Sequence, residues 1–270
     1  MDNQKKYHVL ILAGSRKGGE PFVNAEGKTL KATLDIDGKP MLSHVLETIS
    51  LWPQTKSITI SLPQDAPLIT EAPTLKAQID ASEAQLIPTS TSPCKSVELA
   101  LQKFGEQLKN NEPILIVTGD APLLNHSILN EFTHQNHDKD FVVGIAKVDA
   151  VEHTYPEVKR TRINLKGGAI GGCNLFIMNT KNAEKVVKFW QKLENNRKKP
   201  WRLAANLWMM ALYMLRLLTL KGAQKGLEKQ IGCGIGFVLV TNPDAAIDVD
   251  KQKDLTLVRK IFKSRRAAKH

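Results

Sequence analysis

The chain has 270 residues, of which 42% are hydrophobic, and it carries a formal net charge of +11 at neutral pH. This content is enough for one sizeable α/β domain, and we expect a single domain over residues 1–262 rather than two small ones. The excess of cations favours anionic partners, and part of it lies in a basic C-terminal tail at residues 263–270 that we expect to fray.

The cysteines give no indication of a disulfide framework or a zinc site. Cys94, Cys173 and Cys233 are far apart, their number is odd, and no CxxC pair is present. The N-terminal apolar run in MDNQKKYHVLILAG is too short for a signal peptide. We therefore expect a cytoplasmic protein.

Apolar runs alternate with helical patterns along most of the chain. In chain order, the patterns predict a strand over Tyr7–Ala13, a helix over Met41–Trp52, a strand over Ser57–Leu62, a helix over Lys95–Leu108, and strands over Ile114–Val117, Phe141–Val148 and Cys173–Asn179. Such alternation predicts an α/β fold with a mostly parallel, three-layer αβα sheet. We expect a helical insertion near residues 181–230. In such sheets, ligands bind beyond the carboxyl ends of the strands.

The loop after the first strand, LAGSRKGG, contains the first candidate binding residues. Gly14, Gly18 and Gly19 allow backbone N–H groups to converge on an anion, and Arg16 and Lys17 add positive charge. The loop is neither a P-loop nor a GxGxxG fingerprint, because the required spacing is absent. The alternative is a surface loop in which the glycines only mark turns.

Carboxylates follow two later apolar segments. TGDAPLL places Asp120 after a buried strand, where a carboxylate can hold Mg²⁺ beside substrate phosphates. IDVDKQKDL places Asp248 and Asp250 on one face of a short strand. The alternative for Asp120 and for Asp250 is that each caps the helix that follows it.

Taken in order, four segments make the sequence resemble the MobA-like NTP transferases, which are nucleotidyltransferases of the GT-A type. These segments are LAGSRKGG, Lys31 with the later GKPML, TGDAPLL and the closing IDVDKQKDL, and the resemblance spans Val9–Val258. It implies a Rossmann-like GT-A nucleotidyltransferase fold. The glycines of the first loop follow Ser15 and Arg16 rather than precede them, so the sequence resembles a divergent branch of the family.

The resemblance also implies roles for individual residues. It implies that Arg16 and Lys31 contact phosphates and that Asp120 and Asp250 are ligands of a Mg²⁺ cofactor. It implies a nucleotide site that includes Leu12, Ala13, Gly14, Ser15, Ser96 and Gly119. For Ser96, helix capping is an equal alternative. Lys39, in a tight GKP turn, is interpreted as structural.

The resemblance places the acceptor beside the segment from Tyr155 to Asn179. Its candidate binding residues are Lys159, Arg160, Arg162, Gly172 and Asn174. The alternative is a solvated basic loop followed by a glycine turn.

The implied reaction is the Mg²⁺-dependent transfer of a nucleoside monophosphate from an NTP, with CTP or GTP favoured, to a phosphorylated small molecule. A GT-A glycosyltransferase is the alternative enzyme, but its usual DxD is replaced by GDAP here. A non-catalytic nucleotide-binding or membrane-surface regulator is the third hypothesis. We expect no nucleic-acid partner, because the sequence gives no indication of a basic groove with interleaved aromatic residues.

Residues 200–222 form an unusually apolar stretch, predicted to be helical. A membrane span is disfavoured because it would separate Asp120 from Asp250 and would bury Arg216 in lipid. The remaining interpretations are a helix buried against the domain or a homodimer partner, and an interfacial helix in peripheral contact with the inner membrane surface.

Overall fold

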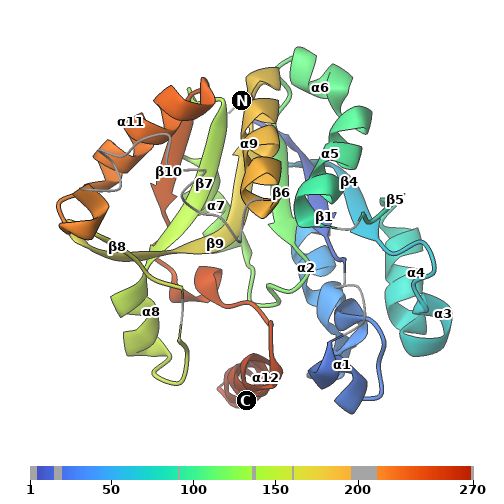
Figure 1. Ribbon diagram of the computed structural model, residues 1–270. Coiled ribbons are helices and arrows are strands. Elements are labelled where there is room, and N and C mark those ends of the chain that lie inside the picture. The colour runs from blue at the N-terminus through green and yellow to red at the C-terminus, as the bar shows by residue number, and fades with distance from the viewer. Residues whose placement is uncertain are drawn as a thin grey trace.

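The computed structural model describes residues 5–14, 20–90, 92–135, 138–159, 161–195 and 212–268. Within these ranges an eight-stranded sheet has the order β10-β7-β9-β6-β1-β4-β5, with β8 paired to β9 (Figure 1). The strands are β1 (Tyr7–Leu12), β4 (Thr55–Leu62), β5 (Gln85–Pro88), β6 (Ile114–Thr118), β7 (Phe141–Lys147), β8 (Ile163–Leu165), β9 (Gly168–Met178) and β10 (Ile235–Leu239). Strand β9 is antiparallel to its neighbours and the other pairs are parallel, which confirms the predicted mostly parallel sheet.

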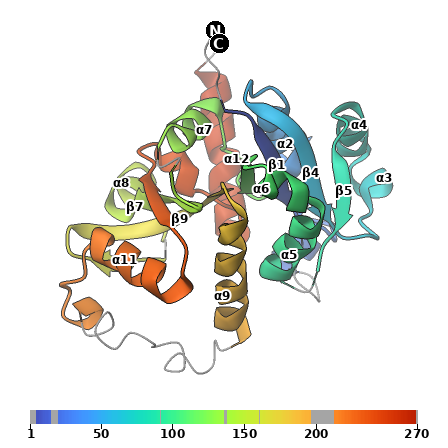
Figure 2. The same ribbon diagram turned by 90° about the horizontal axis from the view of Figure 1, so that it is seen from above.

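Helices cover both faces of the sheet, as Figures 1 and 2 show. One face is covered by α5 (Pro93–Lys103), α6 (Gly105–Lys109), α9 (Glu184–Asn195) and α11 (Leu220–Ile231). The other is covered by α2 (Met41–Ser50), α4 (Pro73–Ala81), α7 (His126–Thr133) and α12 (Gln252–Ala267). The short helices α1 (Pro21–Ala25), α3 (Leu68–Glu71) and α8 (Val148–Thr154) lie at the periphery. The predicted three-layer αβα architecture is therefore confirmed.

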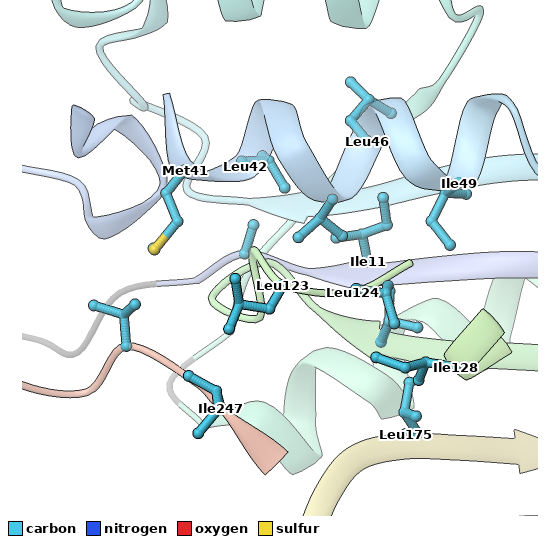
Figure 3. Close-up of a cluster of buried hydrophobic side chains, with 14 of the residues drawn as sticks. Ile11, Met41, Leu42, Leu46, Ile49, Leu123, Leu124, Ile128, Leu175 and Ile247 are labelled. Carbon is cyan, nitrogen blue, oxygen red and sulfur yellow. The ribbon is translucent and has the colours of Figure 1, made fainter. Parts of the chain in front are cut away.

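Alternating side chains of β1 divide between two hydrophobic clusters. Val9 and Ile11 pack on the face of α2 and α7, whereas Leu10 packs on the face of α5 and α9. Figure 3 shows the first cluster, in which Ile11 lies among apolar side chains that include Leu42 of α2. Because both faces are buried, the strand is continuously apolar from Val9 to Leu12, as the sequence pattern indicated.

Glycines account for two differences from the predicted boundaries. The helix predicted over Lys95–Leu108 is divided into α5 and α6, because Phe104 leaves the helical conformation just before Gly105. The strand predicted from Cys173 begins earlier, at Gly168, and continues through further glycines to Met178. Glycine contributes no apolar side chain to the pattern, so the start of this strand was not visible in the sequence.

The apolar stretch at 200–222 is described only from residue 212, and residues 200–211 of that prediction lie outside the described residues. The described part is not one continuous helix, which makes the prediction wrong there. Arg216 has a left-handed backbone with φ of 57°, and α11 begins only at Leu220, capped by Thr219. Among the described residues, no helix is long and apolar enough to cross a membrane.

The basic tail expected at residues 263–270 is instead helical as far as Ala267. Leu255, Val258 and Ile261 of α12 are buried, which anchors the helix before its basic end. Arg265 then pairs with Asp244 at 2.7 Å, which adds a contact near the basic end of the helix. Residues 269–270 lie outside the described residues.

Helix α12 also fixes the segment that precedes α2, which contains Lys31. The guanidinium of Arg259 donates to both carboxylate oxygens of Glu26 at 3.0 and 2.8 Å, and to the Asp35 carbonyl oxygen at 3.0 Å. The ring of Phe262 packs on His44 with centroids 4.5 Å apart. The C-terminal helix thus binds α1 and the hairpin of β2 (Asp35–Ile36) and β3 (Lys39–Pro40).

Arg259→Met is expected to destabilise the fold by about 1 kcal/mol at neutral pH, because it removes a two-pronged ion pair that is only half-buried. The hydrogen bond from Arg259 lowers the pKa of Glu26 below its ordinary value of 4.5. A lowered carboxylate pKa stabilises the folded state above 4.5, and this contribution is lost as the pH falls through the folded-state pKa. Urea unfolding at pH 7 and at pH 3 should therefore give a smaller difference between wild type and variant at pH 3. An equal difference at both values would contradict the assignment.

Candidate active site

Four segments meet at the carboxyl edge of the central strands. The Ala13 amide donates to the Ser61 carbonyl oxygen at 2.9 Å, and the Gly119 amide donates to the Leu12 carbonyl oxygen at 2.8 Å. The Val249 amide donates to the Asp120 carbonyl oxygen at 2.9 Å. These backbone bonds position the ends of β1, β4 and β6 and the IDVD segment side by side.

Lys31 joins two of these segments through its ammonium group. Its Nζ lies 2.6 Å from Asp120 Oδ2 and 3.2 Å from Asp250 Oδ1. Lys31 begins a short 3-10 helix, Lys31–Thr33, and is only 8% exposed. The Thr33 hydroxyl fixes this turn with hydrogen bonds to the Leu30 carbonyl oxygen and to a Glu71 carboxylate oxygen.

The two carboxylates beside Lys31 keep its side chain positively charged. Burial lowers the pKa of Lys31, but the carboxylates of Asp120 and Asp250 outweigh burial, and the net pKa is raised above its usual range. Lys31 is therefore a fixed positive charge at neutral pH. In the described structure this charge faces the two carboxylates of the site.

The loops at this edge approach each other too closely for larger residues. A Cβ on Gly119 would lie 3.0 Å from the Ala13 Cβ and 3.0 Å from a Leu42 methyl carbon. A Cβ on Gly14 would lie 3.0 Å from a methyl carbon of Thr89. Glycine at both positions thus brings the backbone of the first loop close to its neighbours.

A cavity of about 230 Å³ opens above these residues. It is lined by Lys31, Asp120 and Asp250 and by a set rich in hydroxyls: Ser61, Thr89, Ser90, Ser92, Ser96 and Thr118. Three buried atoms of its lining have no hydrogen-bond partner among the described residues, namely Ser61 Oγ, Thr118 Oγ1 and Asp120 Oδ1. Buried polar atoms are normally hydrogen-bonded, so this cavity is suited to a polar ligand.

A second cavity of about 190 Å³ is also lined by Asp250. Its lining includes Gly172, Asn174 and Asp248, with an apolar wall from β7 and α8. The Asn174 amide donates to Asp248 Oδ2 at 2.7 Å, and Asn174 has a left-handed backbone with φ of 52°. Asp250 therefore stands between two adjoining cavities.

The described structure brings many of the predicted site residues together. Leu12, Ala13, Gly14, Lys31, Gly119 and Asp120 line a small recess next to the first cavity. Neither aspartate caps a helix: Asn125 caps α7, and α12 has no side-chain cap. Ser96 is not a cap either, because Ser92 caps α5 and the Ser96 hydroxyl accepts from the Ser90 amide at 2.8 Å. Lys39 pairs with Glu47 at 2.7 Å on the surface.

The predicted cationic residues are not all at the site. Arg16, Ser15 and Arg160 lie outside the described residues. Arg162 is exposed and paired with Asp149 and Glu152, both at 2.6 Å. Lys159 is exposed and does not line either cavity.

Sequence reasoning missed several residues of the first cavity, among them Ser61, Thr89, Ser90 and Thr118. Ser61 and Thr118 lie at the ends of apolar strands, where a hydroxyl among aliphatic residues is the only signal of a site. Thr89 and Ser90 lie in a Ser/Thr-rich stretch that directly follows β5. Their position at the cavity depends on the approach of the segment after β5 to the loop after β1, which the pattern alone does not give.

The donor set fits Mg²⁺. The ion prefers one or two carboxylates together with phosphate oxygens and water, and Asp120 Oδ1 is a buried oxygen without a partner in the described part of the chain. No group of three or more His, Cys, Asp and Glu residues suited to a metal occurs within the described ranges. Both observations agree with a site in which two carboxylates bind the ion and substrate oxygens complete its coordination.

Three structures of known proteins share this fold. A hypothetical transferase from Thermus thermophilus superposes with a TM-score of 0.72 at 22% identity, covering 93% of this chain and 99% of the other. A 4-diphosphocytidyl-2C-methyl-D-erythritol synthase from Anaerococcus prevotii gives 0.58 at 12% identity, covering 96% of each chain. A CMP:2-keto-3-deoxy-manno-octonic acid synthetase complexed with CTP gives 0.55 at 15% identity, covering 97% of this chain and 100% of the other.

Comparison with curated protein sequences gives no significant match. The sequence model of the MobA-like NTP transferase domain matches residues 9–164, which is more than half of the chain and includes the first loop, Lys31 and Asp120. The chain therefore belongs to the MobA-like NTP transferase family and is an enzyme of the nucleotidyltransferase type.

Proposed function

We propose that this enzyme uses Mg²⁺ to move a nucleoside monophosphate from a nucleoside triphosphate to a phosphorylated small-molecule acceptor, with release of pyrophosphate. The observation that carries the proposal is the convergence of Lys31, Asp120 and Asp250 on the first cavity, beside buried polar atoms without partners among the described residues. With Mg²⁺ held by the two carboxylates, this combination suits a ligand that is anionic at one end and hydrogen-bonding at the other.

The proposed chemistry needs no covalent enzyme intermediate. A phosphate oxygen of the acceptor attacks the α-phosphorus, the bond from the α-phosphorus to the bridging oxygen breaks, and pyrophosphate leaves with that electron pair. The acceptor phosphate is largely ionised at neutral pH, so no general base is required. Lys31 keeps its proton and therefore serves as a fixed charge that stabilises the anionic transition state.

Asp120 and Asp250 would hold Mg²⁺, which when bound supplies positive charge and orients phosphate oxygens. Leu12, Ala13, Gly14 and Gly119 would approach the phosphates through their backbone, together with Ser15 and Arg16. For the base we propose cytosine or guanine. The synthetase of the same fold that was solved with CTP supports the first of these.

We assign the acceptor to the second cavity. Gly172 and Asn174 line it, and Asp250 lines both cavities, so the two substrates would meet at Asp250. Lys159, Arg160 and Arg162 would bind the acceptor phosphate. For Arg162 this requires exchange of the carboxylates of Asp149 and Glu152 for phosphate.

Thermal melting with CTP, GTP, ATP and UTP, each with and without MgCl₂, tests the proposal directly. We expect one triphosphate to raise the melting temperature, and Mg²⁺ to enlarge the shift, because a ligand that binds only the folded state stabilises it. That nucleotide should then release pyrophosphate when phosphorylated acceptors are added. Release of a nucleoside diphosphate from a nucleotide sugar would instead indicate a glycosyltransferase, and binding without turnover would indicate a regulator.

Asp120→Asn and Lys31→Met are expected to lower turnover by different routes. Asp120→Asn should remove the Mg²⁺-dependent part of the nucleotide-induced melting shift and reduce turnover about 100-fold or more. Lys31→Met should reduce the maximal rate by a similar factor while it changes nucleotide affinity much less, because its charge acts mainly in the transition state.

The matched control for these variants is Asp80→Asn, which alters a surface pair with Lys76. It should leave the rate and the Mg²⁺ dependence unchanged. Retention of activity within a few-fold of wild type in Asp120→Asn would contradict the metal assignment.

We further propose a peripheral contact with an anionic membrane surface through the described end of residues 200–222. Tyr213, Met214, Leu215 and Leu217 are between 39% and 77% exposed, and Arg216 stands among them. This exposure disagrees with the expectation of a helix buried against its own domain.

Binding to anionic liposomes at low salt should be lost in Met214→Asp but kept in Ile69→Asp, which changes an equally exposed residue of α3. Concentration-dependent dimerisation that Met214→Asp abolishes, without liposome binding, would indicate a homodimer instead.

A further inference from the structure

Three side chains form a row across the sheet at its carboxyl edge. Leu12 of β1 pairs in register with Ser61 of β4 on one side and with Thr118 of β6 on the other. Residues in register on parallel strands project to the same face. That face is the one covered by α5 and α9, because Leu10 and Ile116, two residues earlier on their strands, pack in that cluster. The row is therefore a hydroxyl, an aliphatic side chain and a hydroxyl.

Neither hydroxyl of the row has a partner among the described residues. Ser61 is completely buried, and both Ser61 Oγ and Thr118 Oγ1 are shielded from solvent without a hydrogen bond. A buried hydroxyl in this state costs free energy of folding unless a ligand satisfies it. Both residues line the first cavity, as does Leu12 between them.

The two ends of the row adjoin different parts of the cavity. Adjacent strands lie about 4.8 Å apart, so the outer members are about 10 Å apart, which is comparable with the long dimension of a nucleoside. Thr118 lies two residues before Asp120, toward the charged end of the cavity. Ser61 lies toward β5 and the cavity-lining residues Thr89 and Ser90 that follow it.

We propose that the nucleoside lies along this row, with the Ser61 hydroxyl bonded to the edge of the base and the Thr118 hydroxyl bonded to the ribose. The Leu12 side chain packs against the nucleoside between them. Ser61 thus contributes to the choice of base, and Thr118 positions the sugar relative to Lys31 and Asp120. This assignment rests on the proposed nucleotidyltransferase function and adds two residues to it.

The test compares Ser61→Ala and Thr118→Val with Thr133→Val. Thr133 is a matched control because its buried hydroxyl is satisfied, donating to the Leu129 carbonyl oxygen at 2.8 Å in α7. For each variant, the melting temperature without ligand is measured first. Dissociation constants are then measured for the triphosphate with the largest effect on wild type and for inorganic tripolyphosphate, both with MgCl₂.

We expect Ser61→Ala and Thr118→Val each to weaken triphosphate binding about 5- to 10-fold, the effect of one lost hydrogen bond. Their melting temperatures without ligand should stay equal to wild type or rise, because an unsatisfied buried hydroxyl is removed. Tripolyphosphate binding should not change, because it lacks the nucleoside. Thr133→Val should lower the melting temperature and leave nucleotide binding unchanged.

Three results would overturn the inference while leaving the proposed function intact. These are nucleotide affinity within twofold of wild type in both variants, equal weakening of nucleotide and tripolyphosphate, and a lower melting temperature without ligand in either variant. The last would assign the hydroxyl a structural hydrogen bond. Failure of wild type to bind any of the four triphosphates would reject this inference and the proposed function together.

Discussion

The arrangement of the site depends on one ammonium group placed between two carboxylates. Lys31, Asp120 and Asp250 come from separate parts of the chain, yet a carboxylate oxygen of each aspartate lies within 3.2 Å of Lys31 Nζ. A buried cation without these partners would be costly, and two carboxylates close together without the cation would repel each other. The pair interactions therefore keep three segments together and keep the ammonium charged at the position where phosphates are proposed to bind.

Much of the surrounding structure restricts the position of Lys31. Helix α12 binds the end of α1 and β2 through Arg259, and it packs on α2 through Phe262, which fixes the segment on which Lys31 lies. The Thr33 hydroxyl and Glu71 fix the turn itself. Glycine at position 119 lets the segment that contains Asp120 approach β1 and α2 closely. Each contact restricts the Lys31 turn or the segments it joins, and a site that must place charge on a phosphate needs such rigidity.

The sequence was most informative where side-chain pattern and strand order determine position. The apolar runs of β1, β4, β6 and β7 were evident, and the rule that parallel strands present their carboxyl ends together placed Asp120 near the first loop. Asp250 required the family resemblance, because nothing local relates residue 250 to residue 31.

Ser61 and Thr118 were missed because a hydroxyl at a strand end is common. Only the register with Leu12 and the absence of a hydrogen-bond partner in the described structure make these two residues informative. The start of β9 and the break at Gly105 were missed because glycine leaves no hydrophobic pattern.

Placing Asp250 beside Lys31 has a consequence for how the enzyme is made. During synthesis, the strands that form the centre of the sheet emerge first, and the family model matches only residues 9–164. Asp250 and α12 emerge long afterwards, so a nascent chain that has already formed β1, β4 and β6 still lacks one carboxylate of the site and the helix that fixes Lys31. A chain that ended before residue 250 would therefore contain the strands of the sheet but would lack Asp250 and the helix that holds the Lys31 segment.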